Sequence, residues 1–279
     1  MFNLESYPYI EEQVLSRIED LKNRKLSMDD PTAYKFILGS IDLTTLEGSD
    51  NRQTVLNLCK KAIEFKNEKK QIPSPAAVCV YPPFVATAKE ALAGTNIQVA
   101  SVAGAFPAGQ SPIEIKLAEI KYAIQQGADE IDMVISRGKF LEGNYQEVFD
   151  EISAIRKVCA NVHLKVILET GELKTIQNIY KASQIAMAAG ADFIKTSTGK
   201  ISVNATPEAF LVMMDAVKRH YAETGKMVGI KAAGGISDPE TAMLYLKMLD
   251  AILGKQWMTP QYFRFGASRL ANKVFDKIK

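Results

Sequence analysis

The chain has little histidine and little cysteine. Among its 279 residues are two histidines, His163 and His220, and three cysteines, Cys59, Cys79 and Cys159. Neither histidine belongs to a motif with the spacing of zinc ligands, and the cysteines are widely separated and odd in number. These features argue against a histidine-based metal centre, a serine-histidine triad and a disulfide framework. Free thiols are typical of a reduced, intracellular compartment, so we expect a cytoplasmic protein.

The sequence also lacks a long apolar run and a strong excess of one charge. No apolar run approaches the roughly 18 residues of a membrane span. The first residues, MFNLESYPYIEEQ, carry acids where a signal peptide would have a basic region and then an apolar one. The 34 basic and 32 acidic residues give a formal net charge of +2, so the basic bias typical of nucleic-acid binding is missing. We expect no membrane and no nucleic-acid partner, and any anion site must be local.

Short apolar runs alternate with longer segments of helical period from about residue 35 onward. The eight runs, each followed by a helix candidate, are KFILGSIDL, AAVCVYP, IQVASVAG, EIDMVIS, HLKVILET, DFIKTS, MVGIKAAGG and YFRFGAS. Such alternation predicts an α/β protein with a parallel sheet, and eight units favour closure into a (β/α)8 TIM barrel over residues 35–279. Residues 1–34 fall outside the repeat. Their segment YIEEQVLSRIEDLK has an apolar stripe of Ile10, Val14, Leu15, Ile18 and Leu21, which predicts an N-terminal helical extension packed on the barrel.

Local signals mark where several helices begin and end. Ser111 and Thr206 each precede a proline, so each offers a capping hydroxyl before a proline at the first helical position. Gly127 and Gly190 are each followed by Ala-Asp and a strand candidate, which is typical of glycines just past a helix C-terminus.

Reactive side chains stand near the ends of four predicted strands, where the active site of a barrel lies. They are Asp42, Asp132, Lys195 and Lys231. If Ile194 packs under the helices, strand alternation points Lys195 into the barrel, and Lys231 follows on the neighbouring strand in the same way. Two ammonium groups on adjacent strands repel each other, and burial also disfavours charge, so we expect both lysine pKa values to be lowered. A lysine with a lowered pKa supplies the neutral amine that a Schiff-base enzyme requires.

Two structural alternatives stay open for these groups. Asp132 either offsets the second ammonium or relays protons to a substrate, and both tasks are compatible. A single interior lysine is more often part of a structural ion pair, but three such groups at the catalytic face favour catalysis. Lys165 is a rival nucleophile. Because it lies deeper in its strand, before VILET, we assign it a supporting polar role.

A second set of residues predicts an anion site. Lys200 in TGK follows the sixth predicted strand, Gly234 and Gly235 follow the seventh, and GAS, residues 266–268, follows the eighth. Barrels often bind phosphate in these loops, because glycine lets backbone N–H groups approach an anion. TSTGK is not a nucleotide-binding P-loop, because isoleucines stand where that motif needs a glycine and a hydroxyl residue. Each glycine alone could mark a tight turn, but together they favour a phosphorylated substrate.

Five segments are familiar as a set. They are IDLTTL (41–46), LKVILETGELK (164–174), DFIKTSTGKISVNATPE (192–208), VGIKAAGG (228–235) and FRFGAS (263–268), and they occur in order over most of the chain. Together they resemble deoxyribose-phosphate aldolase, a family of class I aldolases that need no metal. The resemblance implies that there is no cofactor. It also implies reversible cleavage of 2-deoxy-D-ribose 5-phosphate to acetaldehyde and D-glyceraldehyde 3-phosphate in deoxyribonucleoside catabolism.

The same resemblance implies roles for individual residues. It makes Lys195 the Schiff-base lysine, Lys231 the lysine that perturbs it, and Asp132 the acid/base partner. Asp42 and Thr198 then hold substrate hydroxyls. The residues expected around the phosphate are Lys200, Gly234, Gly235, Gly266 and Ser268. The expected partners are a small phosphorylated sugar and acetaldehyde, and a homodimer is one option for an assembly that the sequence does not fix.

Two other functions are open at this point. A transaldolase-like enzyme would also use a Schiff base in a barrel, but the segments 192–208 and 228–235 disfavour it. A barrel that only binds a phosphorylated sugar would predict a damaged catalytic group, whereas Asp132, Lys195 and Lys231 are all present. One departure from the family pattern is Arg269, which replaces a small residue often found beside the phosphate-site serine. We expect it to alter phosphate affinity.

Overall fold

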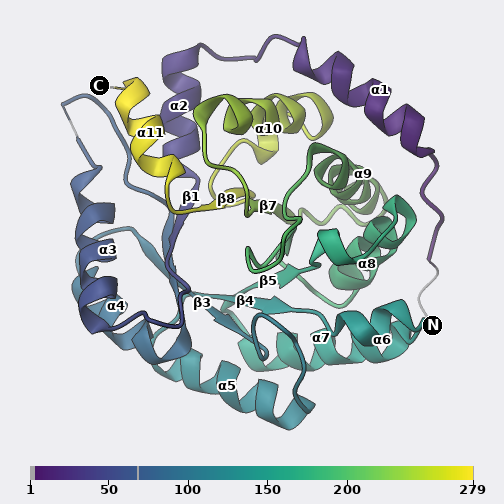
Figure 1. Cartoon of the computed structure of the whole chain (residues 1–279), viewed down its shortest axis with the longest axis horizontal. Coiled ribbons are helices and arrows are strands. Elements are labelled where there is room, and N and C mark those ends of the chain that lie inside the picture. Colours follow the sequence, from purple (N-terminus) through teal and green to yellow (C-terminus); the bar gives the residue numbers. More distant parts are fainter. Residues whose placement is uncertain (1–3, 68, 279) are drawn as a thin grey trace.

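The computed structural model describes residues 4–67 and 69–278, and in them eight parallel strands close into a barrel (Figure 1). The strands follow one another in chain order, and β8 pairs with β1 to complete the circle. They are β1 (Ile41–Thr44), β2 (Ala77–Val80), β3 (Gln98–Ala103), β4 (Glu130–Val134), β5 (His163–Ile167), β6 (Phe193–Lys195), β7 (Gly229–Ala233) and β8 (Phe263–Ala267). The predicted α/β fold, a (β/α)8 barrel, is confirmed.

Helices surround the barrel on its outside (Figure 1). They are α1 (Glu11–Lys22), α2 (Asp30–Gly39), α3 (Arg52–Glu64), α4 (Val85–Ala91), α5 (Ile113–Gln125), α6 (Arg137–Leu141), α7 (Tyr145–Cys159), α8 (Ile176–Ala188), α9 (Pro207–Thr224), α10 (Pro239–Ile252) and α11 (Leu270–Ile278). Single 3₁₀ turns are η1 (Pro82–Phe84), η2 (Thr170–Glu172) and η3 (Lys255–Trp257). In the described part of the chain, no helix combines the length and the apolar character that a membrane span needs.

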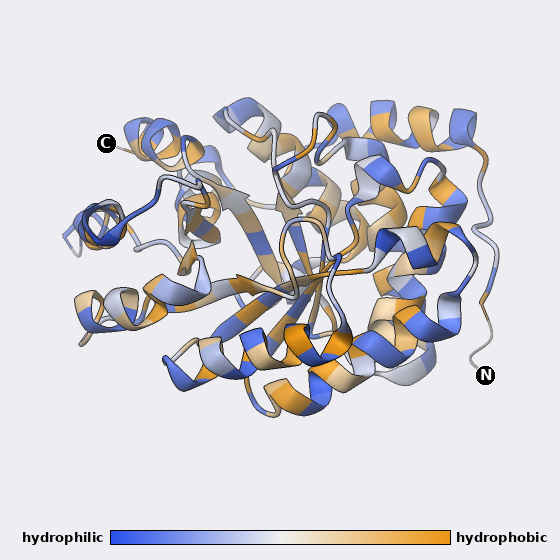
Figure 2. Cartoon of the chain, turned by 60° about the horizontal axis from the view of Figure 1, so that its bottom comes forward, coloured by the Kyte–Doolittle hydropathy of each residue, from blue (hydrophilic) through white to orange (hydrophobic). Residues whose placement is uncertain are grey.

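The main hydrophobic core lies between the strands and the surrounding helices. Val166, Ile194 and Ile230 are fully buried in it, while their strand neighbours Lys165 and Lys195 point to the other side, into the barrel. Figure 2 shows the matching pattern on the helices, whose ribbons carry hydrophobic and hydrophilic residues in alternation. Each fully buried aliphatic side chain contributes roughly 1.5–3 kcal/mol. This layer supplies stability that allows polar groups to occupy the barrel interior.

The segment KFILG is helical, so the first predicted strand began too early. These residues form the second half of α2, and β1 starts only at Ile41. The start of the helix is stabilised because the Asp29 side chain accepts a hydrogen bond from the Thr32 N–H and Pro31 occupies the first turn. The domain boundary expected at residue 34 falls inside this helix. The division of the chain into an N-terminal extension and a barrel domain at that residue stays a prediction.

The predicted helix ends are mostly right. Thr206 caps α9 by accepting from the Ala209 N–H, and Gly127 and Gly190 follow α5 and α8 with φ values of +98° and +97°. The predicted cap at Ser111 is wrong. Helix α5 begins one residue later than expected, with Pro112 at the N-cap position, so the Ser111 hydroxyl stands outside the helix.

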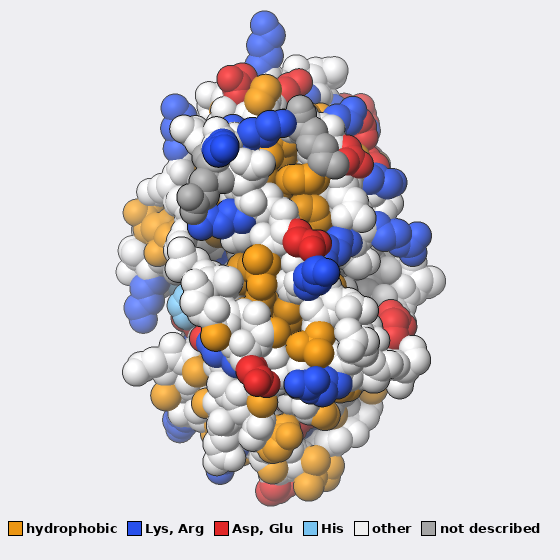
Figure 3. Space-filling view, turned by 90° about the vertical axis from the view of Figure 1, so that its left-hand side faces the viewer, with side chains coloured by type: hydrophobic (Ala, Val, Ile, Leu, Met, Phe, Trp, Pro, Cys, Tyr) orange, Lys and Arg blue, Asp and Glu red, His pale blue; other side chains and the backbone are white. Residues whose placement is uncertain are grey.

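Helix α1 lies against α9 and α10 on the outside of the barrel (Figure 1). Val14, Ile18 and Leu21 are buried there, whereas Ile10 and Leu15 of the predicted stripe are exposed. Arg17 holds the helix in place by donating to both oxygens of Asp215 on α9 at 2.6 and 2.8 Å. On the face drawn in Figure 3, basic and acidic side chains are interspersed, as expected for a net charge of +2.

Candidate active site

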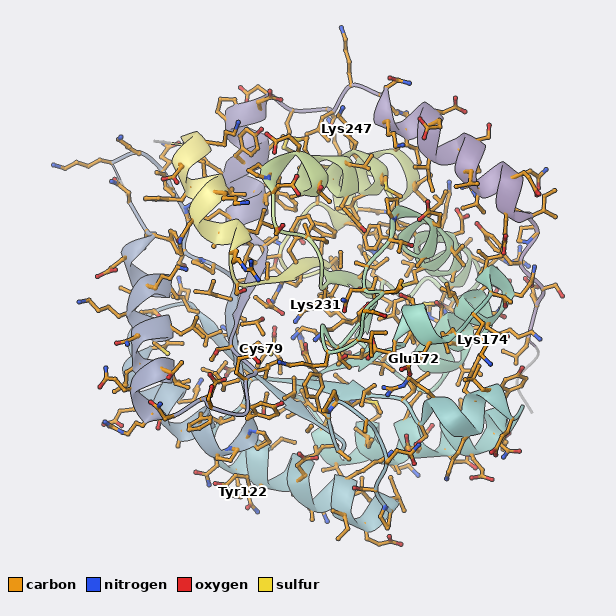
Figure 4. The ribbon with its side chains drawn as sticks, viewed as in Figure 1. Cys79, Tyr122, Glu172, Lys174, Lys231 and Lys247 are labelled. Carbon is orange, nitrogen blue, oxygen red and sulfur yellow. The ribbon has the colours of Figure 1, made fainter. Side chains whose placement is uncertain are left out.

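A cluster of seven charged side chains fills the barrel interior, and we call it the barrel cluster. Its members are Asp42 on β1, Glu130 and Asp132 on β4, Lys165 on β5, Lys195 on β6, Lys231 on β7 and Arg264 on β8, each at most 5% exposed. The register of the strands brings them together, because Lys195 pairs with Lys231 and Lys231 with Arg264 across neighbouring strands. Figure 4 shows Lys231 near the centre of the barrel. The predicted lysine and aspartate positions are thus neighbours in space.

Asp132 is the centre of the barrel cluster. Its Oδ2 accepts hydrogen bonds from Lys195 Nζ at 2.8 Å and from Lys231 Nζ at 2.7 Å, and its Oδ1 accepts from Lys165 Nζ at 2.9 Å. Burial raises the pKa of this carboxyl, but the three ammonium groups outweigh burial and hold the pKa well below its usual value. Asp132 is therefore a carboxylate that touches all three lysines.

Arg264 and Glu130 link further members of the barrel cluster through hydrogen bonds. Arg264 donates to Asp42 at 2.6 Å and to Glu130 at 2.9 Å, and Glu130 also accepts from Lys165. Neither Glu130 nor Arg264 was predicted as a site residue from the sequence. Strand alternation could have found Glu130, because it stands two residues before Asp132 and so shares its face. Arg264 likewise stands two residues before Gly266 on β8.

The three barrel lysines differ in their electrostatics. Burial, helped by the positive charge of Lys231, lowers the pKa of Lys195 against the opposing effect of Asp132. Burial also acts on Lys231, but Asp132 and Asp42 together raise its pKa above the usual value. The pKa of Lys165 is raised in the same way by Asp132, Glu130 and Asp42. The expectation of two lowered lysine pKa values is thus wrong for Lys231, because it has two carboxylate partners where Lys195 has one.

Charge balance favours the same distinction. With all four basic groups protonated, the barrel cluster has four cations and three carboxylates. Loss of one proton balances it at three and three, which removes a buried excess charge. Lys195 is the lysine with the fewest carboxylate contacts. It is therefore the group that releases the proton at least cost.

A cavity of about 400 Å³ opens above the barrel cluster, and we call it the substrate cavity. Lys195 lies at its base, and loops after β1, β6, β7 and β8 form its walls. The predicted site residues that line it are Lys195, Thr198, Lys200, Gly234, Gly235, Gly266 and Ser268. Asp132 and Lys231 do not line it, but Asp132 contacts Lys195 and Lys231 contacts Asp132. Asp42, bonded to Lys231 and Arg264, does not line it either, so its contact with a substrate hydroxyl stays a prediction.

Two larger cavities do not include Lys195. One of about 790 Å³ is lined by Gly39, Ala76, Gln98 and Asp129, which stand at or just before the starts of β1 to β4. It therefore lies at the amino ends of the strands, opposite the catalytic face of a barrel. Another, of about 960 Å³, lies over α8 and α9. Lys195 lines neither, so we place the site in the substrate cavity.

Two glycines let backbone form the wall of the substrate cavity. Gly234 has a φ of +80°, and a Cβ there would lie 2.5 Å from the Asn204 side-chain oxygen. A Cβ at Gly266 would lie 2.8 Å from the Ala233 Cβ. Both positions therefore need glycine, which brings backbone N–H groups close to a bound anion.

Thr198 is held by Glu169, which was not predicted as a site residue. The buried Glu169 carboxylate accepts from the Thr198 N–H at 3.0 Å and from its hydroxyl at 2.5 Å. Glu169 itself has a φ of +58°, an unusual conformation for a residue other than glycine. The signal was present in LKVILET, where this acid stands next to last in the fifth predicted strand.

Cys79 is the one thiol near the site, on β2 beside the barrel cluster (Figure 4). Burial raises its pKa to about 11. The side chain is therefore a protonated thiol at neutral pH and no rival nucleophile. Among the described residues, no three or more His, Cys, Asp or Glu side chains gather in a way that could hold a metal ion.

Comparison with known proteins agrees with this geometry. The human protein named deoxyribose-phosphate aldolase is 44% identical over 277 residues, which cover 95% of this chain and 87% of that protein. The bovine protein of the same name is 47% identical over 248 residues, covering 85% and 78%.

Solved structures of similar fold include proteins described as deoxyribose-phosphate aldolases. The crystal structure of a protein described as a putative deoxyribose-phosphate aldolase, from Coccidioides immitis, matches with a TM-score of 0.74 and 29% identity, covering 96% of this chain and 98% of that one. The tetrameric deoxyribose phosphate aldolase of Aeropyrum pernix, at 24% identity and a TM-score of 0.72 over 96% and 98%, shares the fold. The sequence model of the DeoC/LacD family aldolases matches residues 36–256. This chain therefore belongs to the DeoC/LacD family of aldolases.

Proposed function

We propose that this aldolase, a carbon–carbon lyase, cleaves 2-deoxy-D-ribose 5-phosphate reversibly to acetaldehyde and D-glyceraldehyde 3-phosphate through a Schiff base on Lys195. The observation that carries the proposal is the difference among the barrel lysines. Lys195 lines the substrate cavity and has a lowered pKa, whereas Lys165 and Lys231 do not line it and have raised pKa values. A neutral amine open to a substrate is the group that can attack an aldehyde.

The first half of the reaction forms the covalent intermediate. Neutral Lys195 attacks C1 of the open-chain sugar, and the new C–N bond gives a carbinolamine. Loss of its hydroxyl as water gives an iminium, which needs a proton donor. Asp132 Oδ2 touches Lys195 Nζ and Lys231 Nζ at once, so a proton can pass between the two amines through this carboxylate.

The second half breaks the carbon chain. Removal of the C3 hydroxyl proton lets the C2–C3 electron pair move into the iminium, which releases D-glyceraldehyde 3-phosphate and leaves an enamine. Protonation of the enamine at C2 and addition of water to the resulting iminium then release acetaldehyde and the free amine. The substrate hydroxyls face Thr198, whose position is fixed by Glu169. We assign the phosphate end to Lys200, Ser268 and the backbone around Gly234, Gly235 and Gly266.

Borohydride trapping tests this proposal. We expect acetaldehyde and borohydride to leave a stable two-carbon adduct on Lys195, located by peptide mass spectrometry, because reduction captures the iminium. Cleavage of 2-deoxy-D-ribose 5-phosphate should survive EDTA. An adduct on Lys165 or Lys231, or an unmodified Lys195 in an active enzyme, contradicts the assignment.

Replacement of Lys231 should change the pH dependence of the reaction. In Lys231→Met the like charge that helps to lower the Lys195 pKa is gone, and Asp132 Oδ2 is left to Lys195 alone while Oδ1 keeps Lys165. Both changes raise the Lys195 pKa, so less neutral amine is present at a given pH. We expect the acid limb of the kcat/KM profile to move to higher pH.

The matched control for this prediction is Lys247→Met on α10, at the edge of the molecule in Figure 4. Its pH profile should equal that of the unchanged protein. An acid limb that stays in place or moves to lower pH in Lys231→Met would show that Lys231 does not depress the Lys195 pKa.

The compartment and the assembly of the enzyme belong to the same proposal. We place the enzyme in the cytoplasm, and a homodimer is one option for its assembly. Light scattering on the purified protein distinguishes a dimer from the tetramer named for the Aeropyrum pernix relative.

A further inference from the structure

We infer that Arg269, together with a Glu47–Lys200 ion pair, sets how strongly the substrate cavity prefers a phosphate ester to the unphosphorylated sugar. The inference rests on the proposed function and names the substrate class that each residue favours. Arg269 promotes binding of the phosphate, and Glu47 opposes that binding. Both residues line the substrate cavity at the end assigned to phosphate.

Lys200 is already engaged by an acid. Its Nζ donates to Glu47 Oε1 at 2.9 Å, across the cavity from the loop after β6 to the loop after β1. The Lys200 side chain is 25% exposed and the Glu47 side chain is 69% exposed, so the pair stands where a ligand can reach it. A phosphate that binds Lys200 must compete with this carboxylate and be repelled by it. Lys200 therefore supplies less net attraction than a free lysine.

Arg269 lines the same cavity as this pair, and its charge has no acidic partner among the described residues. It comes directly after Ser268, between β8 and α11, and its side chain is exposed. Within residues 4–67 and 69–278, Arg269 has no ion-pair partner. The other cations of the cavity wall are occupied, since Lys195 is bonded to Asp132 and Lys200 to Glu47. Arg269 is thus the cation of this wall with its charge available to a ligand.

The chemistry of arginine suits this task. A guanidinium presents several N–H donors in a planar fork that matches two oxygens of a phosphate, and it is always charged. The hydroxyl of an unphosphorylated sugar offers no such negative charge. Arg269 therefore favours binding of the phosphate ester. The Glu47 carboxylate repels the phosphate and has little effect on binding of the uncharged sugar.

The test compares kcat/KM for 2-deoxy-D-ribose 5-phosphate and for 2-deoxy-D-ribose, and uses their ratio. We expect Arg269→Ala to lower the ratio about tenfold, the size of one charge-assisted hydrogen bond at a partly solvated site. Arg269→Lys should restore part of it. Glu47→Gln should raise the ratio about threefold, because the repulsion is gone and Lys200 is released. Lys273→Ala, on the exposed side of α11 and outside the cavity wall, is the matched control and should leave the ratio unchanged.

Competitive inhibition by inorganic phosphate gives an independent readout. Its inhibition constant should rise in Arg269→Ala and fall in Glu47→Gln, measured with the unphosphorylated sugar as substrate. Equal losses for both substrates in Arg269→Ala, or an unchanged phosphate constant, would overturn the inference and leave the proposed function standing. If the unchanged protein cleaves neither sugar, the proposed function fails, and the inference fails with it.

Discussion

Replacing Lys195 by leucine should abolish cleavage while the protein stays folded. We expect kcat to fall by at least about three orders of magnitude, because the covalent route through the iminium is lost and about 4 kcal/mol of barrier lowering goes with it. Asp132 keeps Lys165 and Lys231 as partners, so no carboxylate is left alone in the barrel. Steady-state kinetics and the absence of a borohydride adduct check this result.

Stability separates Lys195 from its neighbour on β7. Removal of Lys195 leaves three basic groups facing three carboxylates in the barrel cluster, so we expect the free energy of unfolding to change by less than about 1 kcal/mol. Lys231→Leu, at the paired position on the next strand, is the matched control. It removes a partner of both Asp42 and Asp132, and should cost about 3 kcal/mol or more. If the two variants are equally unstable, Lys195 is a structural residue like Lys231.

Asp132→Asn should damage both catalysis and stability. The amide cannot carry a proton between Lys195 and Lys231, so we expect kcat to fall at least about a hundredfold. It also leaves four basic groups facing Asp42 and Glu130 alone, which should lower the free energy of unfolding by about 3–5 kcal/mol. Denaturant unfolding and steady-state kinetics measure the two losses.

The pH dependence of this stability follows from the Asp132 pKa. In the folded protein the pKa lies well below the usual value of about 3.9. The carboxylate therefore stabilises the fold fully above that usual value, and the contribution is lost only as the pH falls toward the folded pKa. The difference in stability between the protein and Asp132→Asn should be constant near neutral pH and shrink in strong acid.

Glu130→Gln is the matched control for Asp132→Asn. Glu130 lies on the same face of β4 and bonds Lys165 and Arg264, but it makes no bond to Lys195. We expect a comparable loss of stability and a much smaller loss of kcat. Equal losses of kcat in both variants would mean that Asp132 acts through the packing of the barrel cluster and not on the reacting amine.

Much of the barrel was predictable because its signals are local. The alternation of strands and helices, the cap at Thr206 and the glycines after α5 and α8 each depend on residues a few positions apart. The exceptions have the same origin. KFILG looks like a strand because it is short and apolar, but the capping acid and proline ahead of it continue a helix into Gly39. Ser111 followed by Pro112 matches the residue pattern of a helix cap, but the helix starts one residue later, so the Ser111 hydroxyl does not cap it.

The candidate site was predicted where one residue type on one strand was enough. Lys195 follows from strand alternation, and the glycine loops after the last three strands predicted the wall that Gly234 and Gly266 form. Strand alternation places Glu130 on the same face as Asp132, but neither Glu130 nor Arg264 reveals in the sequence which partner it meets on another strand. The ion pair between Lys200 and Glu47, which are 153 positions apart, could not be predicted from the sequence of either loop.

The sequence by itself determined that a lysine stands on the inner face of the sixth strand and that another follows on the seventh. It could not assign their charges, because a pKa depends on the distances to every neighbouring charge and on burial. Only the closed barrel brings Asp42 against Lys231 and leaves Lys195 with Asp132 alone. The tertiary structure thereby raises one lysine pKa and lowers the other, and it exposes the lowered one to the cavity.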